Sequence, residues 1–149
     1  MSSFEAAPYA RLFSCAPPVT MHETFHSTLQ RYPRRIIELL VRNNTRIVPL
    51  LETQRYSDVS GALRRMRVDV DGWPVPPAGL FVIEERTMYV RSLSPMTIAH
   101  ELGHALDCAL GGGIYYSGIS SRIRRAFAGA REFVTVYSAT GLDEYFAVM

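Results

Sequence analysis

Two histidines four residues apart, with a glutamate directly after the first, are the residues of this sequence best suited to chemistry. The run is His100-Glu-Leu-Gly-His104. Residues four apart on an α-helix stack on one face about 6 Å apart, so both imidazoles can bind one metal ion. Glu101 projects roughly 60–100° around the helix from them, where it can reach a water bound to the metal. The pattern predicts a zinc site with Glu101 as its general base.

The surrounding residues place this pair on an amphipathic helix. Ser94 and Pro95 are an N-cap and a proline at the first helical position, and a glycine run at 111–113 follows the expected end. One apolar stripe runs along this helix, formed by Ile98, Leu102, Ala105 and Ala109. The two histidines lie roughly 160–200° from the centre of that stripe. We therefore expect one face in the core and the imidazoles turned away from it.

A glycine in the middle of this helix needs an explanation. Gly103 costs about 1 kcal/mol of helix stability against alanine. Either another backbone or a ligand comes close to it, or the helix simply packs against a neighbouring strand there. The sequence leaves both explanations open.

The same five-residue pattern occurs a second time, as His22-Glu-Thr-Phe-His26. Its apolar face consists of Phe25 and Leu29 alone, and it lies beside an N-terminal segment with no sustained period. Few contacts would hold these histidines rigid as ligands. We expect a coincidental surface pair here.

A catalytic zinc site needs a third protein ligand and keeps its fourth position for water. The candidates after His104 are Asp107, Cys108, Glu132, Asp143 and Glu144. Cys108 is about 12 Å along the helix axis from His100, too far for a shared metal, and is expected to be a buried thiol. Asp107 is expected either to orient a ligand histidine, which we favour, or to cap the end of the helix.

Two separated runs carry a pattern that is found in a known family. They are His100-Glu-Leu-Gly-His-Ala-Leu-Asp107 and Tyr137-Ser-Ala-Thr-Gly-Leu-Asp-Glu144-Tyr-Phe-Ala147. Together they resemble the catalytic core of the anthrax lethal factor family, to which the secreted Pro-Pro endopeptidases also belong. That family has H-E-x-G-H-x-x-D, then a tyrosine seven residues before a glutamate that opens E-[FY]-F-A. The resemblance covers roughly residues 80 to 149.

The resemblance implies a role for each matching residue. His100, His104 and Glu144 would be the zinc ligands, Glu101 the general base, and Tyr137 the donor of a hydroxyl to the oxyanion. It also implies a zincin-like fold, in which the run 80–91 contributes an edge strand that binds an extended peptide or protein substrate main chain to main chain. A bacterial toxin or effector, with an inhibitor or immunity protein as a further partner, would fit this family. Cleavage at Pro-Pro bonds rests on family analogy alone.

Two alternative functions stay open. A regulatory peptidase of the ImmA/IrrE type also uses H-E-x-x-H, although it usually has a shorter gap to the third ligand and often a helix-turn-helix. A non-catalytic zinc-bound binding module is the other. It is suggested by Val148, which stands where relatives usually carry an acid four residues after the third ligand.

The order of the helices and strands expected around these residues predicts an α+β fold. We expect a small, mostly antiparallel sheet and a mainly helical C-terminal part. Helices are expected within 20–44, 94–110, 120–131 and 142–149, and strands at 46–51, 66–70, 80–84 and 87–91. The last two strands read as a hairpin. We expect a poorly ordered arm, or a packed tail, at 1–19 and a single domain at 20–149.

Composition excludes several other classes. Hydrophobic residues make up 48% and charged residues 20%, as in ordinary globular proteins. No apolar run suits a membrane span or a Sec-type signal, so we expect neither, and secretion would need a specialised system. The net charge is +2, every basic residue is arginine, and the short arginine clusters match no nucleic-acid-binding motif. We therefore expect no nucleic-acid partner.

Overall fold

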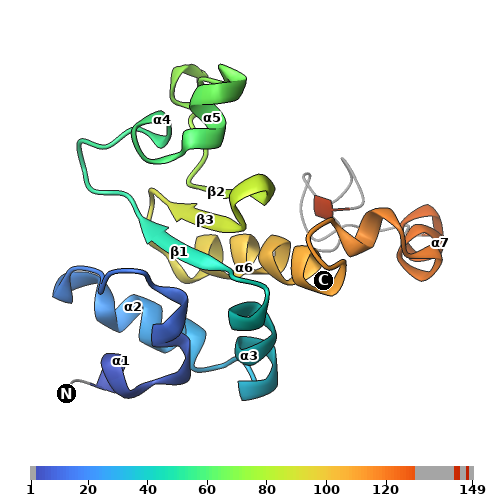
Figure 1. Ribbon diagram of the computed structural model, residues 1–149, viewed down its shortest axis with the longest axis horizontal. Helices are drawn as coiled ribbons and strands as arrows, with labels where there is room; N and C mark the ends of the chain where they lie inside the picture. Colours follow the sequence, from blue (N-terminus) through green and yellow to red (C-terminus); the bar gives the residue numbers. More distant parts are fainter. Residues whose placement is uncertain (1–2, 130–142, 145–146, 148–149) are drawn as a thin grey trace.

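Helices surround a small three-stranded sheet in the part of the chain that the structure describes, residues 3–129, 143, 144 and 147 (Figure 1). The structure is a computed structural model. The elements in chain order are α1 (Ser3–Ala6), η1 (Pro8–Leu12), α2 (Val19–Leu29), α3 (Arg34–Arg42), β1 (Arg46–Pro49), α4 (Tyr56–Val59), α5 (Gly61–Met66), η2 (Val70–Gly72), β2 (Gly79–Val82), η3 (Ile83–Glu85), β3 (Thr87–Val90), α6 (Pro95–Leu110), η4 (Tyr116–Gly118) and α7 (Ser121–Gly129). The predicted α+β class is confirmed.

The sheet is mixed, with the strand order β1-β3-β2. β1 runs parallel to β3, with Ile47 opposite Met88. β2 runs antiparallel to β3, with Leu80 opposite Tyr89. The strand at the start of the run 46–51 and the hairpin are thus confirmed, but the sheet has one parallel and one antiparallel pair where a mostly antiparallel sheet was predicted. Among the described strands, β2 and β1 form the two edges.

Both faces of the sheet are buried. On one face, residues such as Ile47, Phe81 and Met88 join the main core, which includes the apolar side of α6. On the other face, Val82 and Tyr89 join a second cluster with residues of α4 and α5. Figure 1 shows α4 and α5 on that side, and α6, α2 and α3 on the opposite side. Successive side chains along each strand point to opposite faces of the sheet, so each strand contributes residues to both cores.

The helix predicted at 94–110 is confirmed as α6 (Pro95–Leu110). The Ser94 hydroxyl accepts a hydrogen bond from the Thr97 backbone N–H at 3.1 Å, and Pro95 occupies the first turn. The expected stripe is buried: Ile98, Leu102, Ala105 and Ala109 all belong to the main core. Cys108 is the buried thiol that the sequence predicts. One rigid helix therefore carries both a core face and the histidine pair.

The other predicted helices are found with one division. The segment 20–44 forms α2 and α3, which Pro33 separates as the N-cap of α3. The run 120–131 matches α7. Of the segment 142–149, residues 143, 144 and 147 are described, and all three are helical.

The predicted strand at 66–70 is wrong. Met66 ends α5, and Arg67 caps this helix in the left-handed conformation with φ of 55°. The alternation of Met66, Val68 and Val70 suggested a strand, yet only Val70 is buried, and it opens η2. The Asp69 carboxylate accepts the Gly72 N–H and so stabilises this turn.

The N-terminal segment is packed from residue 3 onward, so the alternative of a packed tail holds and the poorly ordered arm is corrected. Phe4, Tyr9, Leu12 and Phe13 are buried in the main core. Their spacing is irregular because it serves a short helix, a 3-10 turn and extended links, none of which has a long hydrophobic period.

The second histidine pair has a structural role in this packing. The His22 ring stacks on Phe4, and its Nε2 lies 2.8 Å from the Pro17 carbonyl oxygen. The His26 Nδ1 is bonded to the Tyr9 hydroxyl. Both imidazoles therefore contact the N-terminal segment, so the pair is half-buried and held in place, where a surface pair with few contacts was expected.

Within the described ranges, no helix has both the length and the apolar character that crossing a bilayer would take.

Candidate metal centre

The two histidines of α6 lie side by side, as their spacing predicts. Their Nε2 atoms are 3.2 Å apart, and their ring centroids are 4.9 Å apart with the planes nearly perpendicular. The His104 side chain is nearly buried, at 7% exposure, whereas the His100 side chain is 26% exposed. The pair thus has an inner and an outer member, and ligands from solvent can reach it past His100.

Glu144 is the third member of this cluster. One oxygen of its carboxylate lies 3.1 Å from the His100 Nε2, and the other lies 3.2 Å from the His104 Nε2. These three residues form a group whose donor atoms could hold a metal ion. Asp143, its neighbour and another candidate from the sequence, is not in that group.

The spacing of the donor atoms suits zinc. With metal–nitrogen bonds of about 2.05 Å and a tetrahedral angle, neighbouring donors should be about 3.3 Å apart. The observed separations are 3.1 to 3.2 Å. Two imidazoles and one carboxylate are also a ligand set that catalytic zinc sites use, with one position left for water. The residues present therefore fit a zinc ion.

The ionisation of the cluster agrees with this fit. The hydrogen bonds from His100 and His104 lower the pKa of Glu144 to about 2, so its carboxylate is charged at neutral pH. The same contact with Glu144 raises the pKa of His100, although burial acts in the opposite direction. Each Nε2 facing the carboxylate would need a proton to bond it, and both protons would enter the same small space. A cation between the three groups satisfies them without that crowding.

Glu101 lies against the edge strand β2, beside the histidines. Its side chain is buried, and burial is the main cause that raises the pKa of this carboxyl; the nearby His104 and His100 lower it. A backbone hydrogen bond from Phe81 also favours its charged form. A Cβ on Gly79 would lie 2.7 Å from the Glu101 Cγ, so only a glycine leaves room for this side chain.

The register of the hairpin shows which backbone groups of β2 face outward. The Arg91 N–H bonds the Ala78 carbonyl oxygen, so residues 78 and 91 are a hydrogen-bonded pair. Pairs alternate along an antiparallel ladder, so Leu80 bonds Tyr89 while Gly79 and Phe81 turn their N–H and C=O groups away from β3. The outer edge of β2 therefore runs past Glu101.

Asp107 is bonded to the loop that follows α6. Its fully buried carboxylate accepts the backbone N–H of Ser117 at 2.7 Å and the Ser117 hydroxyl at 2.6 Å. No hydrogen bond between the described residues joins Asp107 to His104, and the buried Nδ1 of His104 has no partner among them. These contacts match neither of the two roles expected for Asp107, because the carboxylate bonds Ser117 in the loop after α6 rather than a ligand histidine or a terminal group of the helix.

Tyr115 is a residue of the site that the sequence did not reveal. Its ring lies 5.9 Å from the His104 ring and 6.4 Å from Phe81, measured between centroids, and burial raises its pKa. It precedes η4 in the loop that Asp107 holds at Ser117. No periodic pattern marks this loop, and the glycine run before it is its only signal. The predicted Tyr137, and the candidate ligand Glu132, lie outside the described residues.

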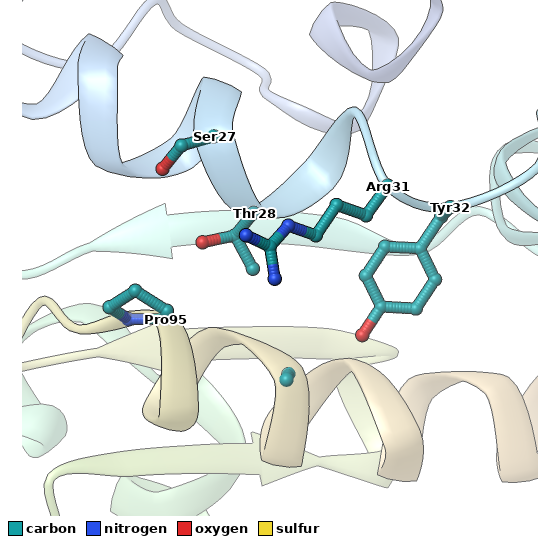
Figure 2. A pocket seen from close by; sticks show the side chains of 6 residues that line it. Ser27, Thr28, Arg31, Tyr32 and Pro95 are labelled. Carbon is teal, nitrogen blue, oxygen red and sulfur yellow. The ribbon is translucent and has the colours of Figure 1, made fainter.

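A cavity of about 380 Å³ lies on another flank of α6. It opens between α2 and the first turns of α6, and the residues that line it are Ser27, Thr28, Arg31, Tyr32, Pro95 and Ala99. Figure 2 shows the Arg31 side chain extending towards Thr28, with the Tyr32 hydroxyl pointing to α6. No member of the histidine–glutamate cluster lines this cavity, so it is not part of the metal centre.

Comparisons with models of protein families, with curated proteins and with solved structures gave no match. A function for this chain must therefore be argued from the residues of the site. The three donor groups and the neighbouring carboxylate of Glu101 are the geometry from which that argument starts.

Proposed function

We propose that this chain is a zinc-dependent endopeptidase. The observation that carries the proposal is the cluster of His100, His104 and Glu144, whose donors are separated by 3.1 to 3.2 Å. Its support is the combination of that cluster with a glutamate one residue after the first histidine and with β2, an edge strand of the described sheet, alongside. A purely structural histidine pair would not require either neighbour.

Each residue of the cluster would have a defined task. His100, His104 and Glu144 would hold the ion, and a bound zinc ion lowers the pKa of a coordinated water towards 7 and polarises a carbonyl group. The Glu101 carboxylate, beside both imidazoles, would accept a proton and deliver it to the nitrogen of the leaving amine. Tyr137 would donate its hydroxyl to the developing oxyanion, a role that rests on the resemblance.

The substrate would be an extended peptide segment. The outward C=O groups of Gly79 and Phe81 and the outward N–H of Gly79 can pair with such a segment as an added strand, while the Phe81 N–H already bonds the Glu101 carboxylate. Because β2 passes directly over Glu101, a peptide on this edge would carry its backbone past the base and the metal ligands. Main-chain pairing gives little sequence preference by itself, so specificity would come from the neighbouring loops.

The test combines metal content with peptide turnover. The purified protein should bind one zinc ion per chain and cleave members of a peptide library, and Glu101→Gln should abolish cleavage while keeping the metal. Glu52→Gln is the matched control, because Glu52 is an exposed glutamate outside the cluster. A protein without stoichiometric zinc, or cleavage indifferent to Glu101→Gln, would refute the proposal. Zinc binding without any turnover would favour the non-catalytic binding module instead.

A further inference from the structure

A glycine of α6, Gly103, lies against Ala147 of the C-terminal segment. A Cβ built on Gly103 would lie 2.7 Å from the carbonyl oxygen of Ala147 and 2.8 Å from its Cα. Real Cβ atoms do not approach other heavy atoms below 3.0 Å. The obstructing atoms belong to backbone, so they cannot rotate aside as the end of a flexible side chain could.

Each partner of this contact lies near a proposed metal ligand in the sequence. Gly103 directly precedes His104, and Ala147 is three residues after Glu144. Ala147 contacts Gly103, and Glu144 contacts His100 and His104, so both described residues lie against the same stretch of α6. The backbone contact and the contacts of the carboxylate with the imidazoles therefore depend on one placement of this segment.

We propose that Gly103 is the positioning residue for the third ligand. Its missing side chain lets the backbone at Ala147 rest on α6, and this seats the Glu144 carboxylate between His100 and His104. The inference rests on the proposed zinc site and adds to it the contact that positions Glu144 as the third ligand. It also answers the question that the sequence left open, because another backbone does come close to this glycine.

Helix stability does not explain a glycine at this position. Alanine in the middle of a helix is favoured over glycine by about 1 kcal/mol. Gly103→Ala should therefore strengthen α6 by itself, while it pushes Ala147 away by several tenths of an ångström. A positioning role therefore predicts weaker zinc binding without a loss of helix stability, whereas a general role in the fold would lower the stability itself.

The experiment measures zinc affinity by competition with a chromophoric chelator. It compares the wild type with Gly103→Ala, Glu144→Ala and the double variant. Gly118→Ala is the matched control, because a Cβ there meets no described atom within 4 Å. We expect Gly103→Ala to weaken zinc binding about 10- to 100-fold, as the loss of a supporting contact to a metal ligand typically does. Gly118→Ala should bind as the wild type does.

The double variant gives the decisive comparison. If Gly103 acts through Glu144, Gly103→Ala should have no further effect on zinc affinity once Glu144 has been replaced by alanine. The visible absorption of bound cobalt should also change in Gly103→Ala towards that of Glu144→Ala, since both lose the same ligand.

The contrary outcomes are distinct. A wild type that binds no zinc would overturn the proposed function and this role together. A wild type that binds zinc, with equal affinity in Gly103→Ala or with the same loss in both backgrounds, would overturn the role of Gly103 alone. A metal-free Gly103→Ala protein that is unfolded by circular dichroism would also overturn it, because the glycine would then serve the whole fold.

Discussion

Replacing the buried carboxylate of Asp107 should release the loop that carries Tyr115. Asp107 and Ser117 are both fully buried, and the carboxylate accepts two short hydrogen bonds from Ser117. Asp107→Ala leaves the Ser117 N–H and hydroxyl without this acceptor in the interior. An unsatisfied buried polar group costs about 1–3 kcal/mol, so the two together should lower the free energy of unfolding by about 2–6 kcal/mol.

Two further variants divide this cost. Asp107→Asn keeps the shape, an acceptor for the N–H and a donor for the hydroxyl, so it should cost less than about 1.5 kcal/mol. Ser117→Ala removes one of the two bonds and should fall between the other variants. The assay is urea denaturation followed by circular dichroism on metal-free protein. A loss below about 1 kcal/mol for Asp107→Ala, or equal losses for the alanine and asparagine variants, would refute the reasoning.

Three other predictions follow from the described side chains. A thiol reagent should modify the exposed Cys15 quickly in the native protein. It should modify Cys108 only after unfolding, because this thiol is buried and burial raises its pKa. Fast modification of both thiols would contradict the burial of Cys108. Burial raises the pKa of Tyr56 and of Tyr89 from 10.0 to about 12, so their stabilisation should be complete below pH 10 and be lost as the pH rises towards 12. Absorbance titration of the native protein should show these two phenols ionising late, and ordinary titration of all tyrosines would contradict it. His26→Ala should loosen the N-terminal segment and raise its proteolysis without changing zinc stoichiometry, and a loss of zinc would contradict the structural role of that histidine.

Local pattern was enough to predict the helix of the site. Ser94, the apolar stripe and the glycine run each act within a few turns, so α6 and the pairing of His100 with His104 could be predicted from the sequence. The same holds for the hairpin of β2 and β3, whose residues are close along the chain. These are the features in which local preference and tertiary packing agree.

Features that depend on distant contacts were not predictable in this way. The apparent strand at 66–70 failed because the left-handed Arg67 ends α5 there, and no alternation of side chains records a backbone angle. The N-terminal aromatics appeared unstructured because they pack against α2 and α3 through turns rather than through a regular element. Tyr115 reaches His104 only because Asp107 fixes its loop, a contact between residues ten apart that leaves no periodic trace.

The candidate third ligand shows the same limit most clearly. The sequence offered five candidates after His104, spacing excluded Cys108, and only the resemblance singled out Glu144. The structure brings Glu144 to the imidazoles and leaves Cys108 buried on α6, bonded to Asn43. Asp107 was expected to orient a ligand histidine or to cap the helix, whereas its hydrogen bonds go to Ser117 in the next loop.

The distance along the chain between His104 and Glu144 has a thermodynamic consequence. These two residues are forty positions apart in the sequence, so an ion that binds both closes a chain loop of that length. A covalent cross-link around such a loop removes about 4 kcal/mol of conformational entropy from the denatured ensemble. A bound metal would then be a reversible cross-link. The melting temperature of the folded protein should rise with the logarithm of the free zinc concentration, and a chelator alone should make the protein more susceptible to proteases.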